Sequence, residues 1–148
     1  MIAVVQRVLS ASVETDGEVI GEIGHGLLAL VAVERRDTEA DVAWMSNRIS
    51  GLRIFEDNAG KMNLGCEEVG GKLLVVSNFT VAGDTQKGRR PSFDNAASFE
   101  TGKAHFENLL KKLAATGTVI KTGAYGEEMR VSLVNDGPIT LIVESPSG

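Results

Sequence analysis

GLLALVAV, residues 26–33, and KLLVVSNFTV, residues 72–81, are the stretches that decide the fold. The first has seven consecutive apolar residues between Gly26 and Glu34, which is too short for a free-standing helix and typical of a central strand. The second follows Gly70-Gly71, is apolar at its start and ends in polar side chains. We therefore expect both stretches to lie in the middle of a β-sheet.

Other strand-like stretches surround these two. Residues 2–9 are apolar at first and then include Gln6 and Arg7, so we expect a strand that is buried at its start and borders a site at its end. Asp16-Gly17 is a turn pair that tolerates positive φ, which predicts a hairpin. The predicted strands are residues 2–9, 11–14, 18–23, 27–33, 53–56, 72–81, 119–122, 129–134 and 139–143.

Two segments show the spacing of apolar residues that helices have. In the first, an N-cap at Asp37 or Thr38 precedes apolar residues at 42, 45, 49 and 52, and Gly51 weakens the end of the helix. In the second, one apolar face runs from Phe99 through residues 106, 109 and 110 to Leu113, and Gly117 stops the helix. The sequence therefore predicts a single α+β domain over residues 1–148, a mostly antiparallel curved sheet packed with two main helices.

The composition of the chain limits the classes of function that it can have. With 148 residues, 43% of them hydrophobic, the chain has enough apolar residues for one core. We expect a soluble, cytoplasmic protein, because no membrane span or signal pattern appears. The lone Cys66 is expected to be buried, without a disulfide or zinc role. The net charge of −5 argues against coating long nucleic acids but allows a small footprint.

Conventional hydrolase motifs are missing. Neither His25 nor His105 lies in an HExxH or HxH context, no GxSxG is present, and both imidazoles are expected to face solvent. We expect no metal site and no cofactor.

Two segments and one loop remain as candidates for a site. Residues 77–81 end a buried strand, although hydroxyls that bond locally would explain them as well. Residues 135–140 contain Gly137-Pro138, which permits a cis bond and close backbone approach to a ligand, although a hairpin turn is the simpler interpretation. Residues 82–97 lack periodicity and form a polar, basic loop.

At these residues the chain closely resembles the D-aminoacyl-tRNA deacylase family over essentially its whole length. Several blocks in order carry the resemblance, which makes it more specific than a lone Asn-x-Gly-Pro. The blocks are residues 4–8 (VVQRV), 52–57 (LRIFED), 60–63 (GKMN), 88–93 (GRRPSF) and 131–138 (VSLVNDGP).

The resemblance implies a homodimer with each active site at the subunit interface. The family's Ser-Gln-Phe-Thr-Leu block falls on residues 77–81 and lines the pocket of one subunit. Its Gly-cisPro motif falls on Gly137-Pro138 and reaches in from the other subunit, where Arg7 helps to hold it. The implied substrate-binding residues are Arg7, Ser77, Asn78, Met129, Gly137 and Pro138.

The implied reaction is hydrolysis of D-aminoacyl-tRNA to free D-amino acid and tRNA, a chirality proofreading step in translation. Fixed main-chain carbonyl oxygens accept hydrogen bonds from the α-amino group and stand where an L side chain would lie, so the L ester is rejected. Glycine has no side chain to exclude. We therefore also expect deacylation of glycyl-tRNA, including glycine mischarged on tRNA(Ala).

Phe79 and Thr80 are the implied catalytic residues. A threonine nucleophile needs an activating base, and the sequence offers no obvious partner. We expect instead that the 2′-OH of the terminal adenosine assists water, while the backbone N–H groups of Phe79 and Thr80 polarise the ester. Lys87, Arg89 and Arg90 are expected to meet acceptor-end phosphates, with a solvated charge run as the alternative.

Two positions depart from the commonest family pattern, Asn78 in place of glutamine and Val81 in place of leucine. A related branch has the Gly-Pro bond in trans and tolerates certain L-aminoacyl substrates; Arg7 with Asn-Asp-Gly-Pro favours the cis, D-selective branch here. Two other functions stay open. One is a non-catalytic dimeric module that binds RNA ends, and the other is a threonine esterase for small D-amino esters that needs no tRNA.

Overall fold

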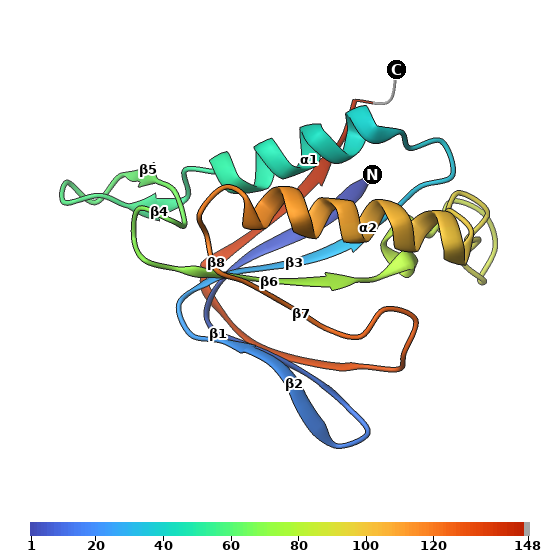
Figure 1. The fold of residues 1–148 in the computed structure, drawn as a ribbon, viewed down its shortest axis with the longest axis horizontal. Coiled ribbons are helices and arrows are strands. Elements are labelled where there is room, and N and C mark those ends of the chain that lie inside the picture. Colours follow the sequence, from blue (N-terminus) through green and yellow to red (C-terminus); the bar gives the residue numbers. More distant parts are fainter. Residues whose placement is uncertain (147–148) are drawn as a thin grey trace.

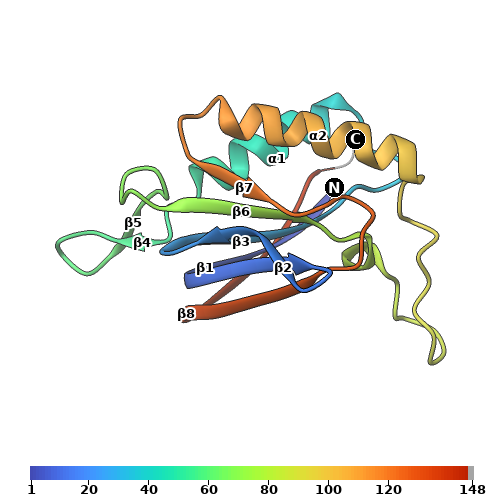
Figure 2. The same cartoon turned by 60° about the horizontal axis from the view of Figure 1, so that its bottom comes forward.

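Most of the apolar stretches at residues 26–33 and 72–81 forms two neighbouring strands at the centre of one curved sheet, as predicted. The computed structural model describes residues 1–146, and Figure 1 and Figure 2 show both helices on the same face of this sheet. Strand order is β2-β1-β3-β6-β7, and β8 pairs with the other edge of β1. The strands are β1 (Ile2–Thr15), β2 (Glu18–Ile23), β3 (Gly26–Ala32), β6 (Lys72–Ser77), β7 (Ile120–Thr122) and β8 (Arg130–Glu144), and β4 (Phe55–Glu56) with β5 (Met62–Leu64) form a separate small hairpin.

Antiparallel pairing predominates, as the hairpin signals predicted. Strand β1 pairs antiparallel with β2, β3 and β8, and the turn at Asp16-Gly17 joins β1 to β2. The pairings of β3 with β6 and of β6 with β7 are parallel, however. Each helix lies in the connection between two of these parallel strands, because parallel neighbours require a crossover that a tight turn cannot make.

Several predicted strand boundaries were wrong. Residues 2–9 and 11–14 belong to a single strand, β1, which runs from Ile2 to Thr15. Strand β6 ends at Ser77, and Phe79–Ala82 form the short 3₁₀ helix η1 instead of extending the strand. The first residues of the predicted strand 53–56 are outside β4. Residues 129–134 and 139–143 belong to a single strand, β8, because the segment between them bulges out of the ladder without reversing the chain.

Helix α1 (Glu39–Gly51) begins with a capping box, in which Asp41 accepts the backbone N–H of Thr38. Helix α2 (Phe99–Ala114) is capped by the Ser98 hydroxyl. Residues 106, 109 and 113 of the predicted apolar face are buried, whereas Phe99 at the start of the helix is 60% exposed.

The expectation that both histidines face solvent holds only in part. The His25 side chain is about half exposed, whereas that of His105 is 15% exposed, with its Nδ1 3.5 Å from Glu39 Oε1. The contact with Glu39, the first residue of α1, places the His105 side chain on the side of α2 that faces α1.

Two apolar cores hold the layers together. The larger fills the space between the helices and the sheet and includes Met45, Phe106 and Leu109. The smaller lies in the hollow of the curled sheet, where Leu28 and Leu74 pack with residues of β1 and β2 and with partly buried residues of β8. Because β2 also lies against β6 and β7, the sheet is nearly closed.

Cys66 is buried as predicted, at 2% exposure. Burial raises the pKa of its thiol to about 11, so the group stays neutral at physiological pH and takes no part in thiolate chemistry.

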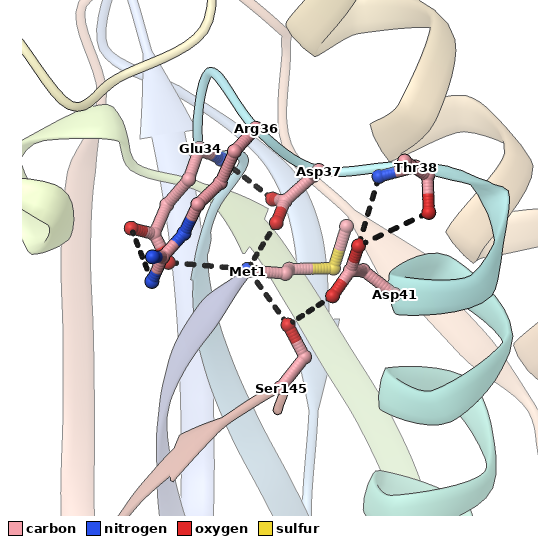
Figure 3. Close-up of polar contacts among 7 residues, drawn as sticks. All are labelled: Met1, Glu34, Arg36, Asp37, Thr38, Asp41 and Ser145. Carbon is pink, nitrogen blue, oxygen red and sulfur yellow. Dashed lines mark hydrogen bonds and ion pairs between the residues drawn. The ribbon is translucent and has the colours of Figure 1, made fainter. Parts of the chain in front are cut away.

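The residues just before β1 and just after β8 meet in a buried polar cluster, drawn in Figure 3. The α-ammonium of Met1, whose side chain is fully buried, donates to Asp37 Oδ1 at 2.5 Å and to Ser145 Oγ at 2.9 Å, and it lies 3.2 Å from Glu34 Oε1. The Ser145 hydroxyl donates in turn to Asp41 at the start of α1. This cluster ties β1 and β8 to the first turn of α1.

Candidate functional site

One pocket lies where the predicted Ser77–Val81 segment leaves the sheet. Figure 1 shows η1, the 83–97 loop, the start of α2 and the β7–β8 connection gathered at one end of the sheet. The pocket has a volume of about 490 Å³. It is lined by Leu30, Val76, Ser77, Asn78, Phe79, Ala97, Phe99, Tyr125, Gly126, Glu127, Met129 and Val131.

Four of the predicted site residues line this pocket together, namely Ser77, Asn78, Phe79 and Met129. Strand β6 places Ser77 at its last position, and Met129 comes directly before β8. The Phe79 ring is 57% exposed and meets the Phe93 ring edge-on, with ring centroids 5.3 Å apart. The pocket therefore combines an apolar wall with the polar end of β6.

Thr80 is exposed and lies beside the pocket without lining it. Its hydroxyl donates to the Asn78 side-chain oxygen at 2.5 Å. That acceptor is a neutral amide, which cannot take up the proton of a nucleophile as a general base does. The contact also gives Asn78 a definite position, folded back over the first turn of η1.

Phe79 and Thr80 are the first two residues of η1. The first amides of a helix have no hydrogen-bond acceptor within it. The bend from β6 into η1 therefore turns two backbone N–H groups away from the ladder at the edge of the pocket.

Gly137 and Pro138 do not line this pocket within one chain. Their peptide bond is cis. They stand in the bulge of β8 opposite Arg7, whose Nη1 donates to the Ile54 carbonyl at 2.6 Å and whose Nε lies 3.2 Å from Asp136 Oδ2. The structure thus brings Arg7 to the Gly137–Pro138 segment and keeps both apart from the pocket of the same chain.

The basic residues Lys87, Arg89 and Arg90 are exposed in residues 83–97, which we name the cationic loop. Asp84 and Ser92 exchange two backbone hydrogen bonds of 2.7 and 2.8 Å, which close the loop at its base. Phe93, just after this base, packs on Phe79, so the base of the cationic loop adjoins the mouth of the pocket.

Comparisons with known proteins identify the family of this chain. The family model described as D-Tyr-tRNA(Tyr) deacylase matches residues 4–144. The chain belongs to the D-Tyr-tRNA(Tyr) deacylase family. A D-aminoacyl-tRNA deacylase of Pelobacter propionicus is 53% identical over 144 residues, which are 97% of this chain and 99% of that protein.

Solved structures of similar proteins share the deacylase-family fold over nearly the full length. That of a c-Myc DNA Unwinding Element Binding Protein is 38% identical, with a TM-score of 0.94 and 99% of both chains covered. That of a probable eukaryotic D-amino acid tRNA deacylase is 15% identical, with a TM-score of 0.82 and coverage of 96% of this chain and 97% of that one. Because the second identity is only 15%, that likeness shows a shared fold alone.

Sequence reasoning missed several residues of this deacylase-family site. Tyr125, the only tyrosine of the chain, lines the pocket, donates to the Phe99 carbonyl at 3.1 Å and has a pKa raised by burial. Asn135 and Asp136 lie in the predicted 135–140 segment directly before Gly137, but they were not predicted as site residues themselves. A lone aromatic residue in a glycine-rich connection was the available signal for Tyr125.

Over residues 1–146, no three histidine, cysteine, aspartate or glutamate side chains are grouped so as to hold a metal ion. In that same range, no helix has the length and apolar character needed to cross a membrane.

Proposed function

We propose that the protein hydrolyses the ester bond of D-aminoacyl-tRNA, releasing the D-amino acid and the tRNA. The observation that carries this proposal is the pocket at residues 77–79, which stands at the family's motif in a chain that matches the family model from residue 4 to residue 144. A volume of about 490 Å³ accommodates an aminoacyl group together with part of a nucleoside.

In the reaction that we propose for this pocket, water attacks the ester and a hydroxyl group of the RNA assists it. The backbone N–H groups of Phe79 and Thr80 polarise the ester carbonyl and stabilise the negative charge that develops on its oxygen. The 2′-OH of the terminal adenosine assists the attack of water. Thr80 is a pocket-edge residue in this scheme, because its hydroxyl donates to the neutral Asn78 amide.

Replacing Thr80 with valine is expected to reduce kcat for D-Tyr-tRNA by roughly tenfold or less, since the backbone N–H groups remain in place. The measurement is single-turnover deacylation, with the melting temperature as the check on the fold. If Thr80→Val is folded and has no detectable turnover, the Thr80 hydroxyl is needed for the reaction and the RNA-assisted scheme is contradicted.

Each active site is completed by a second copy of the chain. Gly137–Pro138 lies outside the pocket of its own subunit, and one hydrogen-bonding edge of β8 has no partner strand among residues 1–146. Apolar side chains that a partner would cover stand on β1 and β8, with Leu9, Val134 and Ile142 exposed by 55%, 51% and 76%. A dimer through this surface inserts Gly137–Pro138 into the partner's pocket.

Rejection of L substrates follows from that insertion. Main-chain carbonyl oxygens of the Gly137–Pro138 segment accept hydrogen bonds from the α-ammonium group and occupy the space of an L side chain. These carbonyl oxygens bind the amino group and do not distinguish one D side chain from another, so many D-aminoacyl groups are accepted. Glycyl-tRNA, including glycine on tRNA(Ala), is accepted for the same reason.

The cationic loop binds the acceptor end of the tRNA. Lys87, Arg89 and Arg90 are exposed and adjoin the pocket mouth through Phe93. A few phosphate contacts suffice for a CCA end, which explains how a chain of net charge −5 takes an RNA substrate.

The second candidate is a dimeric module that binds RNA ends without turnover, and what favours it is that the Thr80 hydroxyl donates to a neutral amide, which does not activate it as a nucleophile. The test is release of labelled D-tyrosine from D-Tyr-tRNA held in excess over the protein. Release of several equivalents per subunit supports the enzyme, whereas tight binding of the tRNA with no release establishes the binding module.

A further inference from the structure

The Gly137–Pro138 segment is held away from the ladder by a bulge of unusual size. On β8, Thr140 pairs with Gln6 and Asn135 pairs with Val8, so four residues of β8 face the single residue Arg7. Four residues without ladder partners need other contacts to keep one shape, because their backbone groups lose the pairing that fixes a strand.

Asn135 supplies the first of these contacts. Its side-chain oxygen accepts the Ile139 backbone N–H at 2.9 Å, and its side-chain nitrogen donates to the Ile139 carbonyl at 3.1 Å. The same nitrogen lies 3.0 Å from the Thr140 hydroxyl. The amide thus replaces a pair of ladder bonds and joins the two ends of the bulge.

Asp136 supplies the second contact. Its carboxylate lies 3.2 Å from Nε of Arg7, a residue only 7% exposed whose Nη1 is anchored on the Ile54 carbonyl. Nε of Arg7 is buried and has no hydrogen-bond acceptor of suitable geometry among residues 1–146, so the ion pair with Asp136 is its main compensation. His25 stands 4.0 Å from the same carboxylate and is half exposed.

We infer that Asn135 and Asp136 are positioning residues that set stereospecificity, because together they fix the direction in which the carbonyl oxygens of Gly137 and Pro138 point. This inference rests on the proposed function. Neither side chain has to touch the substrate: Asn135 sets the width of the bulge, and Asp136 with Arg7 sets its tilt.

The test compares Asn135→Ala and Asp136→Asn with the wild type on D-Tyr-tRNA, L-Tyr-tRNA and Gly-tRNA. Asp16→Asn, in the exposed β1–β2 turn, is the matched control. Each positioning variant is expected to lower the ratio of D to L hydrolysis by about tenfold, the effect of losing about one intramolecular hydrogen bond. Gly-tRNA hydrolysis should change less, because glycine has no side chain to exclude.

A purely structural role would lower the rates on all three esters by one common factor, since it would only reduce the amount of folded enzyme. That result, or an unchanged D-to-L ratio in both variants, overturns the inference while the proposed function stands.

Amide hydrogen exchange separates the two claims. In Asn135→Ala the Ile139 N–H loses its acceptor, so its exchange should become at least tenfold faster whatever the activity. If the wild type hydrolyses none of the esters, the proposed function and the specificity role both fail. Unchanged protection of Ile139 contradicts the bulge-closing role of Asn135.

Discussion

Replacing Gly137 with alanine is expected to lower kcat/KM for D-Tyr-tRNA by about 100-fold or more, because a small displacement of positioning groups has an effect of this size. Gly137 has φ +133°, a conformation that L residues rarely adopt. An added Cβ would also stand 2.8 Å from Ile139 Cγ1 and 2.9 Å from the Ile139 nitrogen. The segment must therefore move, and its carbonyl oxygens move with it.

The fold itself should survive Gly137→Ala, because the segment already lies outside the ladder. Backbone strain of this kind costs on the order of 1–3 kcal/mol. Gly60→Ala is the matched control: Gly60 also has positive φ, at +75°, but nothing lies within 4 Å of an added Cβ. Deacylation kinetics and thermal unfolding should be measured on both variants. Wild-type kcat/KM in a folded Gly137→Ala would contradict the role given to this segment.

Replacing Asp37 with alanine is expected to lower the free energy of unfolding by about 3 kcal/mol, the cost of removing one partner from a buried ion pair. Asp37 accepts from the buried Met1 α-ammonium at 2.5 Å and from the Glu34 backbone N–H at 2.6 Å. Without it the ammonium keeps Glu34 and Ser145 but loses its shortest contact. Chemical denaturation measures the change, with Asp94→Asn, an exposed aspartate, as control.

The same cluster predicts a loss of stability in acid. Burial alone would raise the pKa of Asp41, but hydrogen bonds from Thr38 and Ser145 and the Met1 ammonium outweigh burial and lower the pKa. A carboxyl with a lowered folded pKa stabilises the protein above its unfolded pKa, and this contribution is lost as the pH falls below about 4. A Ser145→Ala variant should lose less stability on acidification than the wild type.

The central strands, both helices and the β1–β2 hairpin could be predicted from sequence because each follows from local periodicity and turn chemistry. The parallel pairing of β3 with β6 could not, since it depends on contacts between strands that α1 and the β4–β5 hairpin separate along the chain. The η1 turn was missed for another reason. Phe79 and Val81 continue the apolar pattern of the strand, although the backbone has already bent.

For the candidate site, the motif residues led to the right segment, and Ser77, Asn78, Phe79 and Met129 meet at one pocket. The opposite wall, with Phe99 and Tyr125, was missed because aromatic residues at helical spacing or in a turn are more often part of the core. The sequence of the bulge, residues 136–139, is also typical of a hairpin turn. Only the register on β1 distinguishes a bulge from a chain reversal.

The central claim is selection by exclusion, and the most direct test is to compare deacylation of D-Tyr-tRNA, L-Tyr-tRNA and Gly-tRNA by the purified protein under identical conditions. We expect rapid loss of the D and glycyl esters, while the L ester decays at the rate seen without protein. Equal hydrolysis of the D and L esters would contradict exclusion by the Gly137–Pro138 segment, and hydrolysis of none by the folded protein would contradict the proposed activity and favour the RNA-end binding module.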